Sequence, residues 1–333
     1  MGLGVRGTNM YTVLTNMGKA PALKTFSDWT NRVAKGDVPP APARPKGIER
    51  NLVTTLWDVG DDHSFMHDQI STDKNHPNVN AGGRVYAVNA GHGQLVVLDP
   101  RENNQVAYDI PTREPREKVP SRFPAPNRPS NFWGMEHLWA NPPYNPADPH
   151  NPMIDSKGRV WLTSKIRANA DPGWCSDPSN KYAEWFPLKT SGRQASYWDP
   201  ETRKFTLIDT CFSTHHLQFD NDANETVYFN ELVGPIFGWI DTKVYDQTHD
   251  EQKAAGWCGQ VLDTNGDGKI TKPWNVYSPP KGGEDLLYAS DTGGTGIAAS
   301  GARAGTALDP KLDTLVNYSM YGLIPSPVDD SVW

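Results

Sequence analysis

Two histidines and a glutamate of this sequence could together carry out acid–base chemistry at a metal ion: His150, His216 and Glu231. His216 opens and Glu231 closes one strand–turn–strand segment, so antiparallel pairing would bring the imidazole and the carboxylate together. An imidazole can act as a general base near neutral pH, and a carboxylate can bind a metal. We therefore predict a catalytic group of these three residues, with His150 and Glu231 as metal ligands. The alternative is that both histidines only bridge neighbouring strands.

Residues 150–164 and 216–231 look like two copies of one unit. In each, a histidine opens a short strand, an Asp-containing tight turn follows, and an apolar strand ends in polar residues. A hairpin repeated around an axis brings equivalent positions to one central face. Since successive strand side chains point to opposite faces, we expect only one of His215 and His216 to face that site.

The element pattern predicts an all-β fold behind a short N-terminal helical segment. The helical spacing of apolar residues covers 9–35 and is broken near 18–21, with a second helix over 29–34 that Ser27–Asp28 caps and Gly36 ends. A Pro-rich linker at 38–47 follows. Strands are then predicted at 51–57, 84–89, 94–100, 105–110, 158–163, 195–200, 204–209, 226–229 and 236–241.

We accordingly divide the chain into a helical segment (1–37), the linker (38–47) and a β-domain (48–333). Long insertions are predicted at 111–147 and 243–290. A further copy begins at Tyr321 and stops at Trp333, so we expect the β-domain to be incomplete at its C-terminal end.

Composition excludes several classes of function. The net charge is −7 and no long basic cluster occurs, so a nucleic-acid partner is not expected. No apolar run approaches the ~20 residues that span a bilayer, and no signal peptide is recognisable at the N-terminus. Three cysteines allow at most one internal disulfide; Cys175 and Cys258 share a Gly-Trp-Cys context, and we favour that pair if any bridge forms.

The His…Asp-x-x-Gly-x-Val-Trp unit resembles the repeat of the virginiamycin B lyase (streptogramin lyase) family of seven-bladed β-propellers. The motif is sharpest at 150–164, 214–231 and 321–333. Phe26-Ser-Asp-Trp29 and 47–51 are also similar to the middle of larger, uncharacterised bacterial propeller proteins, which carry carboxypeptidase-regulatory-like and cytochrome-like regions upstream. The resemblance implies an incomplete propeller in a periplasmic or secreted protein.

For the site, the resemblance implies two histidines and a glutamate around Mg²⁺ on the propeller axis. His216 matches the catalytic histidine, Glu231 the glutamate, and His150 the histidine of the preceding copy. In the first copy, Ser164 occupies the position that Glu231 occupies in the second. In the last copy, Tyr321 occupies the position of His216. In the reaction that the resemblance implies, the metal polarises a carbonyl, the histidine removes the adjacent C–H proton and a C–O bond breaks.

A second metal signal lies in residues 263–271. Asp263, Asn265 and Asp267 place oxygen side chains at the first, third and fifth positions of a calcium loop, and Lys269 and Thr271 occupy its seventh and ninth positions. Trp274 replaces the usual glutamate at position 12. We predict Ca²⁺ here, completed by another carboxylate or by water; the alternative is a turn without an ion.

Other polar clusters are assigned mainly to surface or packing roles. His63, His67, Asp68 and His76 are predicted to lie in a surface loop, the alternative being that they are further metal ligands; Glu136 and His137 are predicted to lie in a packed insertion, the alternative being that they line a pocket. A low-ranked substrate pocket for an anionic group near His150 comprises Lys165, Arg167, Arg193 and Tyr321. The alternative for its three basic residues is solvated surface charge.

These patterns favour a metal-dependent, lyase-like propeller acting on an unknown small or polymeric substrate, and we expect a monomer. The alternative is a non-catalytic, calcium-stabilised propeller that serves as a binding or docking module in a larger exported protein. A redox partner domain is a third interpretation, although this chain contains no redox motif.

Overall fold

The chain divides into two units, residues 1–60 and 61–333, which we describe separately. The computed structural model describes residues 19–37, 40, 43, 46, 66–73, 75–119, 129–130, 134–138, 145–167, 172–185, 193–231, 236–278, 302–303, 308–316, 322–328 and 331–333. The strand predicted at 51–57 therefore lies outside the described residues.

The first unit contains helix α2, Lys19–Ala34. Pro21 falls in its first turn, where the missing N–H costs no intrahelical hydrogen bond. Gly36 follows the helix with a φ of +74°, so the predicted end is confirmed. The predicted cap at Ser27–Asp28 is wrong, because Asp28 lies inside α2 and pairs with Lys24 one turn earlier.

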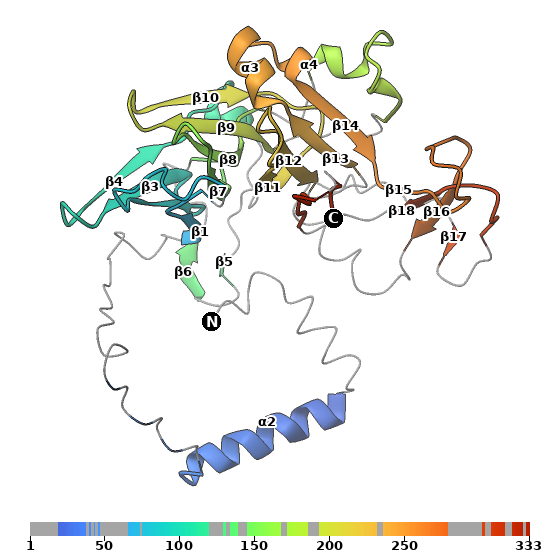
Figure 1. The fold of residues 1–333 in the computed structure, drawn as a ribbon. Coiled ribbons are helices and arrows are strands. Elements are labelled where there is room, and N and C mark those ends of the chain that lie inside the picture. Colours follow the sequence, from blue (N-terminus) through green and yellow to red (C-terminus); the bar gives the residue numbers. More distant parts are fainter. Residues whose placement is uncertain are drawn as a thin grey trace. The chain divides into compact units, whose positions relative to one another are not determined.

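Three four-stranded antiparallel sheets dominate the second unit (Figure 1). In each sheet the strands pair antiparallel in chain order. The first sheet comprises β1 (Met66–Ile70), β2 (Val85–Asn89), β3 (Gln94–Asp99) and β4 (Asn104–Asp109). The second comprises β7 (His150–Ile154), β8 (Val160–Lys165), β9 (Arg193–Asp199) and β10 (Lys204–Ile208), and the third β11 (Thr214–Phe219), β12 (Val227–Glu231), β13 (Ile236–Ile240) and β14 (Ala255–Gly259).

The Asp-containing turns predicted in both copies are confirmed. Between β7 and β8, Asp155 accepts a hydrogen bond from the Arg159 N–H, and Gly158 takes a φ of +79°. Between β11 and β12, Asp222 closes the turn in the same way and Glu225 takes a φ of +51°. The repeated motif therefore specifies a turn and fixes the hairpin register in both sheets.

Part of the predicted insertion at 243–290 belongs to the third sheet. Helices α3 (Thr242–Thr248) and α4 (Glu251–Ala254) connect β13 to β14. Asp241 caps α3 by accepting from the Val244 N–H, and Asp250 caps α4. The apolar strand β14 was hidden in the sequence by its two glycines, Gly256 and Gly259, which lower β-propensity.

The first strand of each sheet lies next to the first strand of the following sheet. β7 packs beside both β1 and β11, so these three strands form one row. The described part of the second unit is mostly strand with few and short helices, which confirms the all-β prediction.

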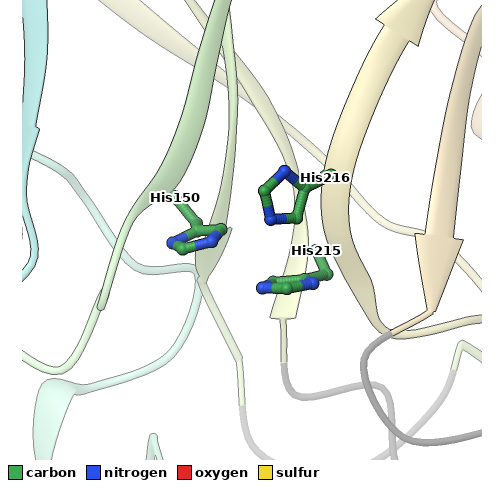
Figure 2. A group of neighbouring side chains, drawn as sticks. All are labelled: His150, His215 and His216. Atoms are coloured by element: carbon green, nitrogen blue, oxygen red, sulfur yellow. The ribbon is translucent and has the colours of Figure 1, made fainter. Parts of the chain in front are cut away.

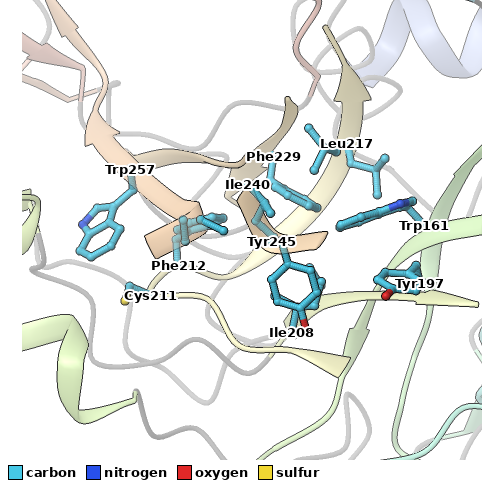
Figure 3. Close-up of a cluster of buried hydrophobic side chains, with 14 of the residues drawn as sticks. Trp161, Tyr197, Ile208, Cys211, Phe212, Leu217, Phe229, Ile240, Tyr245 and Trp257 are labelled. Carbon is cyan, nitrogen blue, oxygen red and sulfur yellow. The ribbon is translucent and has the colours of Figure 1, made fainter. Parts of the chain in front are cut away.

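Apolar side chains between the sheets form two buried clusters. The larger one joins the second and third sheets and includes Trp161, Phe229 and Trp257 (Figure 3). The smaller one joins the first and second sheets around Trp198 and Leu95. Burying one large apolar side chain contributes about 1.5 to 3 kcal/mol, so these clusters hold the row of first strands in place.

A fourth sheet is mixed. β16 (Asn275–Ser278) pairs in parallel with both β17 (Ala302–Arg303) and β18 (Thr314–Val316), and β15 (Val261–Leu262) pairs antiparallel with β18. Near the C-terminus, Ile324 and Trp333 exchange two backbone hydrogen bonds, and Pro325 and Val332 form a β-bridge. The remaining elements are β5 (Pro129–Ser130), β6 (Gly134–Leu138) and the 3₁₀ turns η2 (Arg116–Lys118), η3 (Gly173–Ser176) and η4 (Ala183–Trp185).

The disulfide joins Cys175 to Cys211, and Cys258 is a free thiol. The favoured pair of Cys175 and Cys258 is therefore wrong. Strand alternation explains the outcome: on β14, Trp257 faces the core that contains Cys175, so its neighbour Cys258 points to the other face. Burial raises the pKa of the Cys258 thiol to about 12, which keeps it protonated at neutral pH.

Removing this disulfide should destabilise the protein. Cys175 and Cys211 are separated by 36 positions, so their bridge restricts a loop of the unfolded chain. We expect the double Cys→Ala variant to lose about 3 to 4 kcal/mol of unfolding free energy, measured by urea denaturation. Cys258→Ala is the control and should change little. A loss below about 1 kcal/mol in the double variant would contradict a structural role for the bridge.

No helix in the described ranges is long and apolar enough to cross a membrane.

Candidate metal centre

The strands β1, β7 and β11 each carry a β-bulge at the same place in their pairing with the next strand of their sheet. There, two residues of β1, β7 or β11 stand opposite one residue of β2, β8 or β12. Such β-bulges redirect side chains and are frequent next to functional sites. The bulged pairs are His67–Asp68 on β1, Asn151–Pro152 on β7 and His215–His216 on β11.

The bulge on β11 brings both of its histidines to one place. The ligand atoms of His215, His216 and His150 all lie within 4.8 Å of one another. The prediction that only one of the two adjacent imidazoles faces the site is therefore wrong, because the bulge interrupts strand alternation. Asn230 stands opposite the pair: its Oδ1 accepts from the His216 N–H at 2.6 Å, and its Nδ2 lies 3.4 Å from His215 Nδ1.

Four imidazoles meet between the three first strands. The rings of His150 and His215 stack with centroids 4.5 Å apart, and His216 meets His150 edge-on at 4.9 Å (Figure 2). The His67 ring lies 4.0 Å from that of His150, between centroids. The ligand atoms of His67, Asp68 and His150 also lie within 4.8 Å of one another. His150 is thus shared by two groups of potential ligands.

The His150 side chain is only 4% exposed. Its Nε2 is buried and has no hydrogen-bond partner among the described residues. A buried polar atom without a partner costs about 1 to 3 kcal/mol, and a bound metal would supply the missing partner. Burial, and then the positive charge of Arg193, hold the pKa of His150 well below its usual value near 6.5. The neutral imidazole that results is the form that binds metals.

Asp68 connects two of the first strands at this centre. One of its carboxylate oxygens, Oδ2, lies 2.9 Å from His67 Nδ1 and accepts from the Asn151 N–H at 3.0 Å. Burial raises the pKa of Asp68, but the hydrogen bond and charge of His67 outweigh it, and the net shift is downward. An ionised carboxylate at the second nitrogen of a histidine fixes the ring for metal binding.

The structure brings His150 and His216 together as predicted, but Glu231 lies outside both groups of clustered ligand atoms. Glu231 is fully buried at the end of β12, opposite Thr214, and its carboxylate accepts from the Ser213 N–H at 3.1 Å. In the register of the sheets, Thr214 rather than His216 is the equivalent of His150.

The basic residues of the predicted anion pocket are paired with carboxylates. Arg193 lies 2.6 Å and Lys165 3.7 Å from Asp148, and all three are buried. Arg167 pairs with Asp209 at 3.3 Å. Solvated surface charge is therefore wrong for Arg193 and Lys165. Tyr321 lies outside the described residues.

The surface-loop prediction is wrong for His67 and Asp68, which lie on β1 with side chains 11% and 25% exposed. The His-Asp pair of β1 occupies the same bulge position as the His-His pair of β11, but this correspondence depends on strand pairing and is not visible in the sequence spacing. His76 is half exposed in a turn and lies 2.6 Å from Asp73, beside Glu225. Glu136 and His137 are on β6, and His63 lies outside the described residues.

The predicted calcium loop forms a compact turn between β15 and β16. The carboxylates of Asp263 and Asp267 cluster with that of Asp313, which the sequence reasoning did not identify. Asn265, Lys269 and Thr271 lie in the same loop. The Lys269 N–H donates a hydrogen bond to the Asp267 carboxylate.

No family model matches this chain, and no curated protein matches it.

The histidine centre does not fit the Mg²⁺ that the resemblance implied. Mg²⁺ prefers an octahedral shell of oxygen atoms and retains several waters. The centre offers four imidazoles, at His67, His150, His215 and His216, and a single clustered carboxylate, Asp68. Imidazole nitrogen suits Zn²⁺, Fe²⁺, Cu²⁺ or Ni²⁺ instead.

Proposed function

We propose that this protein is a metal-dependent, lyase-like enzyme whose centre binds one divalent transition-metal ion through histidines of three adjacent sheets. The observation that supports this is the clustering of His67, His215 and His216 around His150, whose buried Nε2 has no hydrogen-bond partner among the described residues. Such a donor set is uncommon without a functional reason, since packed histidines normally have hydrogen-bond partners. The proposal replaces Mg²⁺ with an ion that favours nitrogen ligands.

We further propose that the sheets belong to a β-propeller. Three four-stranded meanders in succession, with their first strands in one row, are the arrangement that propeller blades adopt around an axis. The three bulges then face the axis, where propellers commonly place their sites.

The two most buried rings, those of His150 and His215, are suited to holding the metal together with His67. His67 is oriented by Asp68 and would keep a fixed tautomer. His216 is less buried than its neighbour His215. We therefore assign the role of general base to His216 and not to His215. A metal in this position would act as a Lewis acid on a substrate carbonyl.

The proposed reaction is an elimination. His216 accepts a proton from the carbon next to the carbonyl, the C–O bond breaks with its electron pair leaving on oxygen, and a C=C bond forms. The substrate class is therefore a carbonyl compound with an oxygen leaving group at the β-position.

The disulfide supports an exported protein. Disulfides persist in oxidising compartments and are rare in the bacterial cytosol. Cys175 and Cys211 are bridged and buried, so we propose a periplasmic or secreted location.

Turnover of virginiamycin B, the compound for which the resembled family is named, tests the reaction. The new C=C bond conjugated to a carbonyl raises the ultraviolet absorbance. We expect turnover by the Zn²⁺- or Fe²⁺-loaded protein and a fall of about 10²- to 10⁴-fold in kcat for His216→Ala, the usual contribution of a general base. Metal content should stay near the wild-type value in that variant.

His249→Asn is the matched control, because His249 is an exposed residue in the left-handed conformation after α3, which Asn tolerates. It should leave turnover unchanged. Equal turnover by wild type and His216→Ala would contradict the role of His216. A metal-loaded protein without turnover would favour the docking-module interpretation over the lyase.

A further inference from the structure

The loop between β15 and β16 has the backbone of a cation-binding turn. Gly266 and Gly268 both adopt positive φ, +76° and +74°. Asp263 accepts hydrogen bonds from the N–H groups of both glycines, and Asp267 accepts from the Lys269 N–H. The loop therefore curls around its own acidic side chains. By itself this arrangement is also that of an ordinary Asp-rich turn.

Asp313 distinguishes this loop from such a turn. It comes from a distant part of the chain, directly before β18, and is fully buried. One carboxylate oxygen, Oδ2, accepts from the Thr271 N–H at 2.8 Å. The other, Oδ1, is buried and has no hydrogen-bond partner among the described residues. A buried carboxylate oxygen without a partner is costly, and a cation removes that cost.

The carboxylate oxygens of Asp263, Asp267 and Asp313 lie within 4.8 Å of one another. We propose that this group binds Ca²⁺ and that Asp313 supplies the carboxylate that an EF-hand takes from position 12 of its loop. Trp274 occupies that position here, and it cannot bind a cation through its side chain. A residue 39 positions further along the chain therefore completes the site.

The donor set selects the ion. Three carboxylates and the amide oxygen of Asn265 are hard oxygen ligands, which suit Ca²⁺ and exclude a preference for zinc or copper. Lys269 carries a positive charge, so only its main-chain carbonyl is a suitable ligand, as at position 7 of an EF-hand loop. Thr271 acts on Asp313 through its N–H and hydroxyl group.

The ion would tie together segments that are far apart in sequence. Asp313 also accepts from the Asn275 N–H through its main-chain oxygen at 2.7 Å, where β16 begins beside β18. Thr264 donates to the carbonyl of Leu312 at 2.7 Å. Bound Ca²⁺ would therefore stabilise the fourth sheet by holding the β15–β16 loop on the start of β18. This site is independent of the histidine centre.

Calorimetric titration of the full chain with CaCl₂ tests the proposal. The protein is first treated with a chelator and dialysed. We expect one equivalent of Ca²⁺ to bind to wild type, and binding at least about tenfold weaker in Asp313→Asn, which corresponds to about 1.4 kcal/mol. Hydrogen exchange at the Thr271 and Asn275 amides should slow when Ca²⁺ is added to wild type, because both amides donate to Asp313.

Asp267→Asn is a second test. The Asp267 side chain is exposed, so the substitution should weaken Ca²⁺ binding in the same way without unfolding the protein. Asp309→Asn is the matched control; Asp309 lies close in sequence but outside the carboxylate group and should leave binding unchanged. Absence of binding to wild type, or equal affinity in Asp313→Asn, would overturn the proposal. Equal affinity for Mg²⁺ would overturn the assignment of the ion.

Discussion

Asp155→Ala should lower the free energy of unfolding by about 3 to 5 kcal/mol, the usual cost of removing one partner from a buried ion pair. Asp155 is fully buried in the turn between β7 and β8. Its Oδ2 accepts from Arg159 Nε at 2.6 Å and from Trp161 Nε1 at 2.8 Å. Its Oδ1 accepts from the backbone N–H of Arg159. Alanine would leave these donors buried without their acceptor.

Asp246→Ala provides the comparison. Asp246 contacts the same guanidinium from the other side, with Arg159 Nη1 at 2.5 Å, but its side chain is 18% exposed and also pairs with Lys157. Water can replace part of this interaction, so we expect a loss of about 1 kcal/mol. Urea denaturation of both variants measures the difference. Equal losses in the two variants would contradict the central place of Asp155 in this network.

The pH dependence of the Asp246 effect follows from its pKa. Burial raises the pKa of Asp246, but hydrogen bonds from Arg159 and Lys157 outweigh it and lower the value. The stabilisation is therefore present above the ordinary pKa of the unfolded carboxyl group and is lost as the pH falls through the lower folded value. The wild-type advantage over Asp246→Ala should accordingly shrink in acid.

Most strands of the three antiparallel sheets, and the Asp-containing turns of the two copies, could be predicted from the sequence because their signals are local. Asp155 and Gly158 specify a turn whatever the rest of the chain does, and Val160 and Trp161 begin an apolar strand. Turns and strands that are specified by neighbouring residues in this way do not depend on distant contacts, so they can be predicted from the sequence alone. The strand β14 was not predicted, since it depends on pairing with β13 and carries two glycines.

The candidate site could be predicted only in part. Periodicity places one residue of an adjacent pair on each face, and a bulge depends on backbone pairing that the sequence does not display. For that reason His215 was assigned away from the site. His67 was assigned to a loop, because β1 is short and polar and gains its position by packing beside β7.

The same limit applies to contacts between distant segments. Asp313 completes the carboxylate group of residues 263–267, and Cys211 rather than Cys258 reaches Cys175. Neither pairing follows from local spacing, because the topology of the sheets decides which segments meet. The cysteines illustrate this directly: Cys175 and Cys258 share a Gly-Trp-Cys context, but Cys175 bonds to Cys211 and Cys258 is a free thiol.

Removal of His150 should have the largest effect on metal content, because this residue belongs to both groups of clustered ligand atoms. Loss of an outer-shell partner of a ligand already reduces metal affinity by about 10- to 100-fold. Loss of the shared ligand should cost at least as much. Asp68→Asn should give the smaller loss, since it removes the carboxylate beside His67 without removing a ring.

The most direct test of the metal centre is the transition-metal content of the purified protein after loading with Zn²⁺ and dialysis, measured by elemental mass spectrometry. We expect about one equivalent in wild type and in His249→Asn, and at least a ~10-fold lower content in His150→Ala. Ca²⁺ content should be the same in all three proteins, because residues 263–267 and Asp313 are unchanged. Zn²⁺ retained equally by wild type and His150→Ala, or by neither, would contradict a metal centre at these histidines.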